Sequence, residues 1–155
     1  MILFRRYKRY IHVCLLMGLW LTSMSCAATE SPAEKMTPSL YDRLGGKPAI
    51  TAVVDAFVGN VANDSRINGR FATTDIPQLK RHLVDQVCSA SGGPCIYSGR
   101  DMKTTHAGMR ISTAEFTALV QDLVAALNTF SVPDREQKEL LGLLGPMQSD
   151  IVEIP

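Results

Sequence analysis

His106 is the side chain whose type and setting best suit metal binding. It follows Met102 by four residues, so the two share one face of a short helix, and Met109 and Ile111 add apolar bulk nearby. A neutral imidazole on an apolar face suits the iron of a porphyrin, with the other ring nitrogen donating to a backbone carbonyl. The spacing alone is also typical of a histidine that is simply packed, and by itself it favours that second interpretation.

A second histidine, His82, borders a predicted apolar stripe. It follows Leu79 by three residues and precedes Gln86 by four, and Leu79 shares the stripe with Leu83. The imidazole could point at a ligand held between helices, or it could lie at the rim near Asp85. Spacing alone favours the second alternative, in which the imidazole lies near Asp85.

Other catalytic arrangements are missing from the sequence. It has no Ser-His-Asp motif, no glycine-rich phosphate loop and no HExxH motif, so a hydrolase or transferase has no residue set to support it. Cys88 and Cys95 are too few ligands for an iron–sulfur cluster or a zinc site. They flank a flexible Ser-Ala-Ser-Gly-Gly-Pro turn, and we favour a disulfide between them over two free thiols.

The elements that would position these histidines are all helices. Apolar residues recur at helical spacing between proline, glycine and capping residues, and no alternating strand pattern appears. The first two expected helices are residues 39–44 and Pro48 to Asn63, and Pro77 begins a third, with Thr74 or Asp75 as its cap. A short helix is expected at residues 101–106, and a capping box at Ser112 and Glu115 begins a long one. The last helix begins at Pro133 and is interrupted at Gly145 and Pro146. The sequence therefore predicts an all-α domain.

Residues 1–26 have the layout of a secretory signal peptide. A basic start precedes an apolar run that is about half the length of a membrane-spanning helix, and small residues follow. An uncleaved anchor is the alternative. Cys26 resembles the lipid-modified cysteine of a lipoprotein but lacks the usual preceding leucine, so ordinary cleavage after Ala27 or Ala28 is the second possibility.

The domain organisation follows from that reading. We expect a signal peptide at 1–26, a polar linker at 27–38 and one domain at 39–155, exported to the periplasm and attached to a membrane only through a lipid on Cys26. Of 16 basic and 15 acidic residues, four basic and no acidic ones lie in residues 1–26, which leaves a net formal charge of −3 beyond them. Nucleic acid is not an expected partner, because binding to phosphates requires a basic patch.

In their order and spacing, the motifs of the body resemble those of the group I truncated haemoglobins. The resemblance runs from about Ser39 to Val152. It rests on Leu40 to Gly46 (LYDRLGG), the Gly92-Gly93 pair, Tyr97 to Lys103 leading to His106, and Gly142 to Pro146. It implies a truncated globin-like two-over-two helical sandwich with haem b as its cofactor.

The resemblance also implies roles for particular residues. His106 corresponds to the proximal iron ligand, and His82 to a position where some members carry a histidine that binds iron as a sixth ligand. Phe71 corresponds to a phenylalanine that stacks on haem. The cofactor-binding residues expected are Phe57, Val58, Phe71, Leu79, His82, Leu83, Tyr97, Met102, His106, Met109, Ile111 and Phe116.

The sequence departs from the family on the ligand side of the haem. Many members place a tyrosine on the second helix and often a glutamine on the distal helix, where they hydrogen-bond oxygen. Val58 and Leu83 stand at those positions, and a slip of one residue would put Phe57 or Gly59 there instead. None of these carries a hydroxyl, so the sequence does not predict high-affinity oxygen storage.

Three functions follow, in order of preference. The first is a haem protein that binds oxygen, nitric oxide or carbon monoxide at iron ligated by His106. Ligand binding is favoured over nitric oxide dioxygenase or peroxidase chemistry, which would add a reductase as partner. The second is an electron-transfer or sensor protein with iron held by both His82 and His106. The third is a helical interaction domain without haem.

Overall fold

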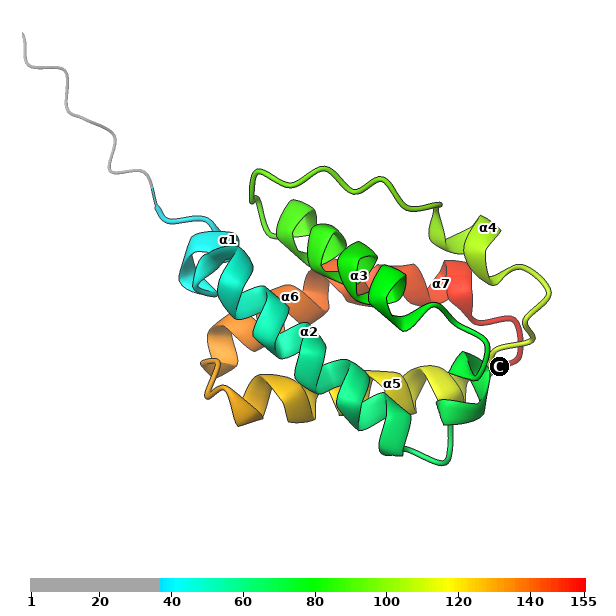
Figure 1. The fold of residues 1–155 in the computed structure, drawn as a ribbon. Coiled ribbons are helices and arrows are strands. Elements are labelled where there is room, and N and C mark those ends of the chain that lie inside the picture. The colour runs from blue at the N-terminus through cyan, green and yellow to red at the C-terminus, as the bar shows by residue number, and fades with distance from the viewer. Residues whose placement is uncertain (1–36) are drawn as a thin grey trace, which may run out of the picture. The chain divides into compact units, whose positions relative to one another are not determined.

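The computed structural model describes residues 37–155, and they form a set of helices of unequal length (Figure 1). The expected signal peptide at 1–26 and nearly all of the expected linker at 27–38 lie outside these residues. The elements are α1 (Leu40–Arg43), α2 (Gly46–Asn63), η1 (Asn68–Phe71), α3 (Ile76–Ala90), α4 (Met102–His106), α5 (Thr113–Thr129), α6 (Asp134–Leu144), η2 (Gly145–Met147) and α7 (Gln148–Ile151). In residues 37–155 no helix is long and apolar enough to span a membrane.

Local capping explains where the helices begin. The side chain of Asp75 accepts a hydrogen bond from the backbone N–H of Gln78 at 2.9 Å, so Asp75 rather than Thr74 caps α3. Ser112 and Glu115 form both halves of a capping box at the start of α5. Pro133 lies one residue before α6, at its cap rather than inside its first turn. The predicted all-α body is confirmed.

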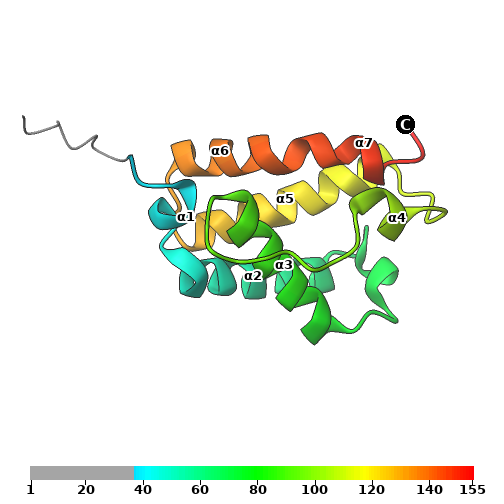
Figure 2. The same cartoon turned by 90° about the horizontal axis from the view of Figure 1, so that it is seen from above.

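Helix α2 is the centre of the packing. It packs against α3 and α5, while α1 contacts both α2 and α6, and α4 contacts α7 (Figures 1 and 2). The segment between α3 and α4 runs back past α3 before it reaches α4 (Figure 1). Helix α3 contributes Val84, Val87 and Cys88 to the core, whereas α4 has no buried side chain and lies at the edge of the core.

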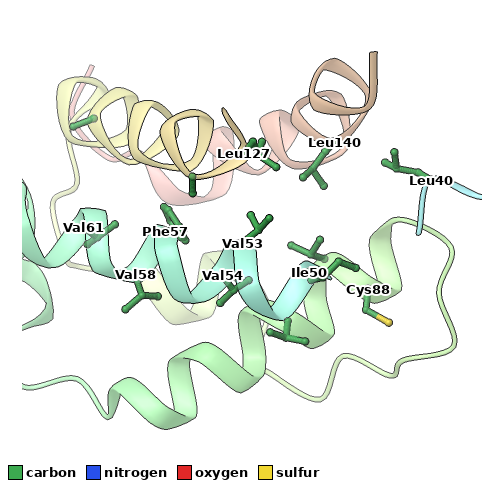
Figure 3. Packing of buried hydrophobic residues seen from close by; sticks show 14 of the residues in the cluster. Leu40, Ile50, Val53, Val54, Phe57, Val58, Val61, Cys88, Leu127 and Leu140 are labelled. Carbon is green, nitrogen blue, oxygen red and sulfur yellow. The ribbon is translucent and has the colours of Figure 1, made fainter. Parts of the chain in front are cut away.

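Two faces of α2 build the core. Val54 and Val58 lie on the side toward α3, and Val53 and Phe57 lie on the side toward α5 (Figure 3). Both pairs follow a four-residue spacing, which keeps their members on one side of a helix. The largest fully buried side chains in the described part of the chain come from three other helices, α5, α6 and α3: Leu127, Leu140 and Cys88.

A disulfide joins the end of α3 to the segment that follows it. Cys88 and Cys95 are bonded with their Cα atoms 5.7 Å apart, and Cys88 is fully buried. Gly93 lies inside this small loop, and a Cβ there would stand 2.8 Å from both the carbonyl oxygen and the sulfur of Cys88 and would overlap the ring of Tyr41. The loop therefore closes around a position with room for glycine alone.

Candidate functional site

Helix α4 carries His106, and its start is fixed by Asp101. A carboxylate oxygen of Asp101 accepts from the N–H of Thr104 at 2.8 Å, and this hydrogen bond lowers the pKa of Asp101. The hydroxyl of Thr105 donates to the carbonyl of Asp101 at 2.8 Å. A helix of five residues is too short to be stable on its own, so these contacts hold its geometry.

The imidazole of His106 is oriented by its own helix. Its Nδ1 lies 2.8 Å from the carbonyl oxygen of Met102. Because a carbonyl oxygen can only accept, Nδ1 carries the proton, and the lone pair is left on Nε2. No hydrogen bond to Nε2 is formed within residues 37–155, and the residue is half-buried. In its neutral form, His106 is therefore held in one tautomer with Nε2 unprotonated.

The second histidine contacts the segment that leads to α4. The rings of His82 and Tyr97 meet edge-on, with centroids 6.2 Å apart. The hydroxyl of Tyr97 donates to the carbonyl of Arg100 at 2.9 Å, while burial and the charge of Asp101 raise the pKa of Tyr97. The phenol thus stays protonated near neutral pH, and the segment holds its ring against α3.

Gln86 links the helices that carry the two histidines. It lies on α3 four residues after His82, and its Nε2 is 3.9 Å from the sulfur of Met102 on α4. The same nitrogen is 3.3 Å from the sulfur of Met147 in η2. Met102 shares α4 with His106, so the elements bearing the two imidazoles lie on either side of this amide–thioether contact.

The other residues expected at the site differ in how far their side chains are buried. Phe57 and Val58 are buried within α2, whereas Phe71 and Leu83 are partly buried and pack against the core. The side chain of Met109 turns outward and is 48% exposed. Partly exposed side chains also occur at Leu79, Ile111 and Phe116.

This set of residues suits haem. Apolar side chains left partly open on η1, α3, α4 and α5 offer surface for a flat apolar group, and His106 adds a nitrogen whose lone pair is free in the neutral ring. Phe71, Leu83 and Phe116 are the aromatic and aliphatic members. The donor set thus agrees with a porphyrin iron.

Sequence reasoning missed three charged residues beside the turn that follows His106. Arg70 donates to the carbonyl of Met109 at 2.7 Å, and it pairs with Glu115. Glu153 accepts from the N–H of Gly108 at 2.6 Å. These partners lie some 40 residues apart in the chain, so no local pattern could reveal them; the capping box at Ser112 pointed to Glu115 only as a helix cap.

An all-helical domain with a half-buried histidine beside partly open apolar side chains is typical of two-over-two globins. Residues 39–153 match the bacterial-like globin family. The chain is 35% identical to the group 1 truncated haemoglobin GlbN of Mycolicibacterium paratuberculosis over 113 residues, which cover 73% of this chain and 83% of that protein. A similar relative from a Nostoc species is also 35% identical, and 97% of its length is covered. The chain belongs to the bacterial-like globin family, as a group 1 truncated haemoglobin.

Solved structures confirm the expected two-over-two helical sandwich. The truncated haemoglobin of Tetrahymena pyriformis in its Fe(III) form has a TM-score of 0.72 and 29% identity, covering 74% of this chain and 98% of that one. A Synechococcus haemoglobin in the cyanomet state with covalently attached haem has a TM-score of 0.70 and 30% identity, with the same coverage of both chains. The group II protein of Bacillus anthracis, at 19% identity and a TM-score of 0.71, shares the fold.

Proposed function

We propose that this globin holds haem b through Nε2 of His106 and binds diatomic gases there. The family's members are haem proteins that bind such ligands. The observation that supports the assignment to His106 is its hydrogen bond from Nδ1 to Met102, which leaves Nε2 free. When bound, haem supplies an iron centre that takes up a gas molecule and exchanges an electron.

The chain's own residues would tune that centre from two sides. The carbonyl of Met102 keeps the proton on Nδ1 and fixes the orientation of the ring, as carbonyl partners of metal-binding histidines do. The partly open apolar side chains of Phe71, Leu83 and Phe116 would exclude water from a bound haem. On α2 the expected ligand-side position holds Val58, which donates no hydrogen bond, so ligands that depend on a distal donor gain little there.

The decisive test is the absorption spectrum of His106→Ala after reconstitution with haem. The variant should no longer bind haem stoichiometrically, because only burial of the porphyrin would then hold the haem, without the bond from iron to the His106 nitrogen. His82→Leu is the matched control, since it removes the other imidazole and should keep its haem. A fully loaded His106→Ala protein with an unchanged spectrum would refute the assignment.

A second candidate is iron held by both histidines, as in an electron-transfer or sensor protein. It is supported by the half-buried His82, which lies one turn from the Gln86–Met102 contact between α3 and α4. A low-spin ferric spectrum that becomes high-spin in His82→Leu would establish it, whereas a high-spin spectrum in both proteins would reject it. Nitric oxide removal would require an electron donor such as a reductase, and nitric oxide consumption by the reduced protein tests that activity.

We also propose export to the periplasm, with residues 1–26 as the signal. The Cys88–Cys95 disulfide supports this, because disulfides persist in oxidising compartments. Cell fractionation of the full chain should place it outside the cytoplasm. Replacing Cys26 with Ser then separates the two modes of processing: loss of membrane attachment indicates a lipid anchor, and an unchanged soluble product indicates ordinary cleavage.

A further inference from the structure

The turn that follows His106 has an unusual backbone. Gly108 has a φ of 78° and Arg110 a φ of 54°, and a non-glycine residue is uncommon in this left-handed region. The N–H of Met109 donates to the carbonyl of His106 at 3.0 Å, so the turn is coupled directly to the histidine. A conformation of this kind persists only where surrounding contacts hold it.

Two charged side chains from distant parts of the chain hold this turn. The two carboxylate oxygens of Glu153 accept one hydrogen bond each, from the N–H groups of Gly108 and Arg110. From the other side, Arg70 donates to the carbonyl of Met109 at 2.7 Å and to that of Arg110 at 3.5 Å. Four backbone groups in three consecutive residues are therefore bound by one carboxylate and one guanidinium.

Each of these side chains is itself fixed. Arg70 pairs with Glu115 at 2.7 Å, and Glu115 is locked in the capping box of α5. Glu153 lies in a tail bound by its backbone: its N–H donates to the carbonyl of Ile111 at 2.9 Å, and the N–H of Thr113 donates to Ile154 at 2.9 Å. The clamp thus connects η1, the start of α5 and the tail after α7.

We propose that Glu153 and Arg70 are positioning residues that set the orientation of the His106 imidazole by clamping the turn at residues 108–110. This inference rests on the proposed function, in which His106 is the iron ligand. Helix α4 is only five residues long, so its N-terminal cap at Asp101 fixes one end and the clamp fixes the other. Without the clamp, water would replace the charged partners and the turn would sample other conformations.

Glu153→Gln is the sharpest test. Glutamine keeps the shape but offers one acceptor oxygen where two N–H groups need partners. Arg70→Gln removes the other half of the clamp and provides a second variant. Asp150→Asn is the matched control, because Asp150 lies in the neighbouring α7 and its exposed carboxylate makes no hydrogen bond or ion pair within the described residues.

Three measurements separate positioning from simple stability. In the haem-free proteins, amide hydrogen exchange at residues 108 and 110 should become about fivefold faster in Glu153→Gln. In the reconstituted proteins, haem transfer to excess apomyoglobin should speed up by about the same factor, since hydrogen bonds to a charged partner are lost. The ferrous Fe–His stretching frequency should shift in both clamp variants and stay constant in Asp150→Asn.

The possible results are distinct. Faster amide exchange without any change in the Fe–His frequency or in haem transfer would show a merely structural clamp and overturn the proposal, as would unchanged exchange. If Glu153→Gln fails to fold, Arg70→Gln decides by the same criteria. If the parent protein shows no Fe–His band, the measurement is repeated in His82→Leu, which leaves the sixth position open. If the band is missing there as well, the proposed ligation by His106 fails, and the positioning role falls with it.

Discussion

The rings of His82 and Tyr97 meet edge-on at a centroid distance of 6.2 Å and an interplanar angle of 74°. This contact joins α3 to the segment that leads to His106, and Tyr97 is in turn fixed by its hydrogen bond to the carbonyl of Arg100. The aromatic contact therefore competes with any movement of His82 toward iron.

Removing the ring of Tyr97 should release His82. In the ferric protein, Tyr97→Leu should shift the equilibrium toward low-spin, six-coordinate haem. We expect its equilibrium constant to rise by about threefold, which corresponds to the free energy of an edge-to-face contact. Absorption spectra of the reconstituted variant measure this. Tyr97→Phe keeps the ring and should leave the fraction unchanged; equal spectra for all three proteins would contradict the prediction.

Breaking the disulfide should destabilise the domain. Cys88 and Cys95 are seven residues apart, and closing so small a loop is worth about 2 kcal/mol in the chain-entropy account. Cys95→Ser is preferred to a change at Cys88, because Cys88 is fully buried and a hydroxyl there would add a cost of its own. Thermal unfolding should show a lower Tm for the variant, and reductant should lower the Tm of the parent alone.

Glu115 should stabilise the fold in a pH-dependent way. Its hydrogen bonds with the N–H and hydroxyl of Ser112 and its pairing with Arg70 lower the pKa of Glu115. A lowered pKa in the folded state gives stability that is present above the unfolded value and is lost as the pH falls through the folded value. Glu115→Gln keeps the capping position but removes the charge, so it should lower the free energy of unfolding by about 1 kcal/mol at pH 7. The difference should vanish at a pH low enough to protonate Glu115 in the folded protein, as urea unfolding at several pH values can show.

Ionisation of Asp122 should lower the stability of the fold, the opposite of the effect of Glu115. Burial, reinforced by the charge of Asp64, raises the pKa of Asp122, and one of its carboxylate oxygens is buried without a hydrogen-bond partner. The folded protein then binds more protons than the unfolded chain, so stability is highest below the unfolded pKa and falls as pH rises through the folded one.

Removing the charge of Asp122 should remove this loss of stability at neutral pH. Asp122→Asn should raise the Tm at pH 7 by about 2 °C, and the gain should vanish at a pH below the unfolded pKa. Asp150→Asn serves as the exposed control and should show no gain. A Tm that is equally raised at both pH values would mean that charge burial is not the cause.

Local chemistry made much of the fold predictable. Asp75 and the Ser112–Glu115 box act within four residues of their partners, so the starts of α3 and α5 can be derived from composition and spacing. The four-residue spacing of Val54 and Val58 likewise reveals a buried face of α2. The resemblance to globins then supplied the arrangement of helices, which periodicity alone does not determine.

The surroundings of His106 could not be derived in the same way. The tautomer of its ring follows from Met102 four residues earlier, which the helical spacing anticipates. The clamp on the next turn depends on Arg70 and Glu153, which meet it only because η1 and the tail converge there. Charged residues in exposed segments have no periodic pattern, so tertiary packing alone decides which of them find a backbone partner.

Gly93 changes what the segment after α3 can tolerate. Surface loops usually accept substitution and insertion readily, yet this position is enclosed by the carbonyl and sulfur of Cys88 and by the ring of Tyr41. Any side chain there would have to displace the bonded cysteine or α1. In the evolution or engineering of this protein, a half-exposed loop residue is thus as constrained as a residue of the interior, and new sequence is better introduced elsewhere on the surface.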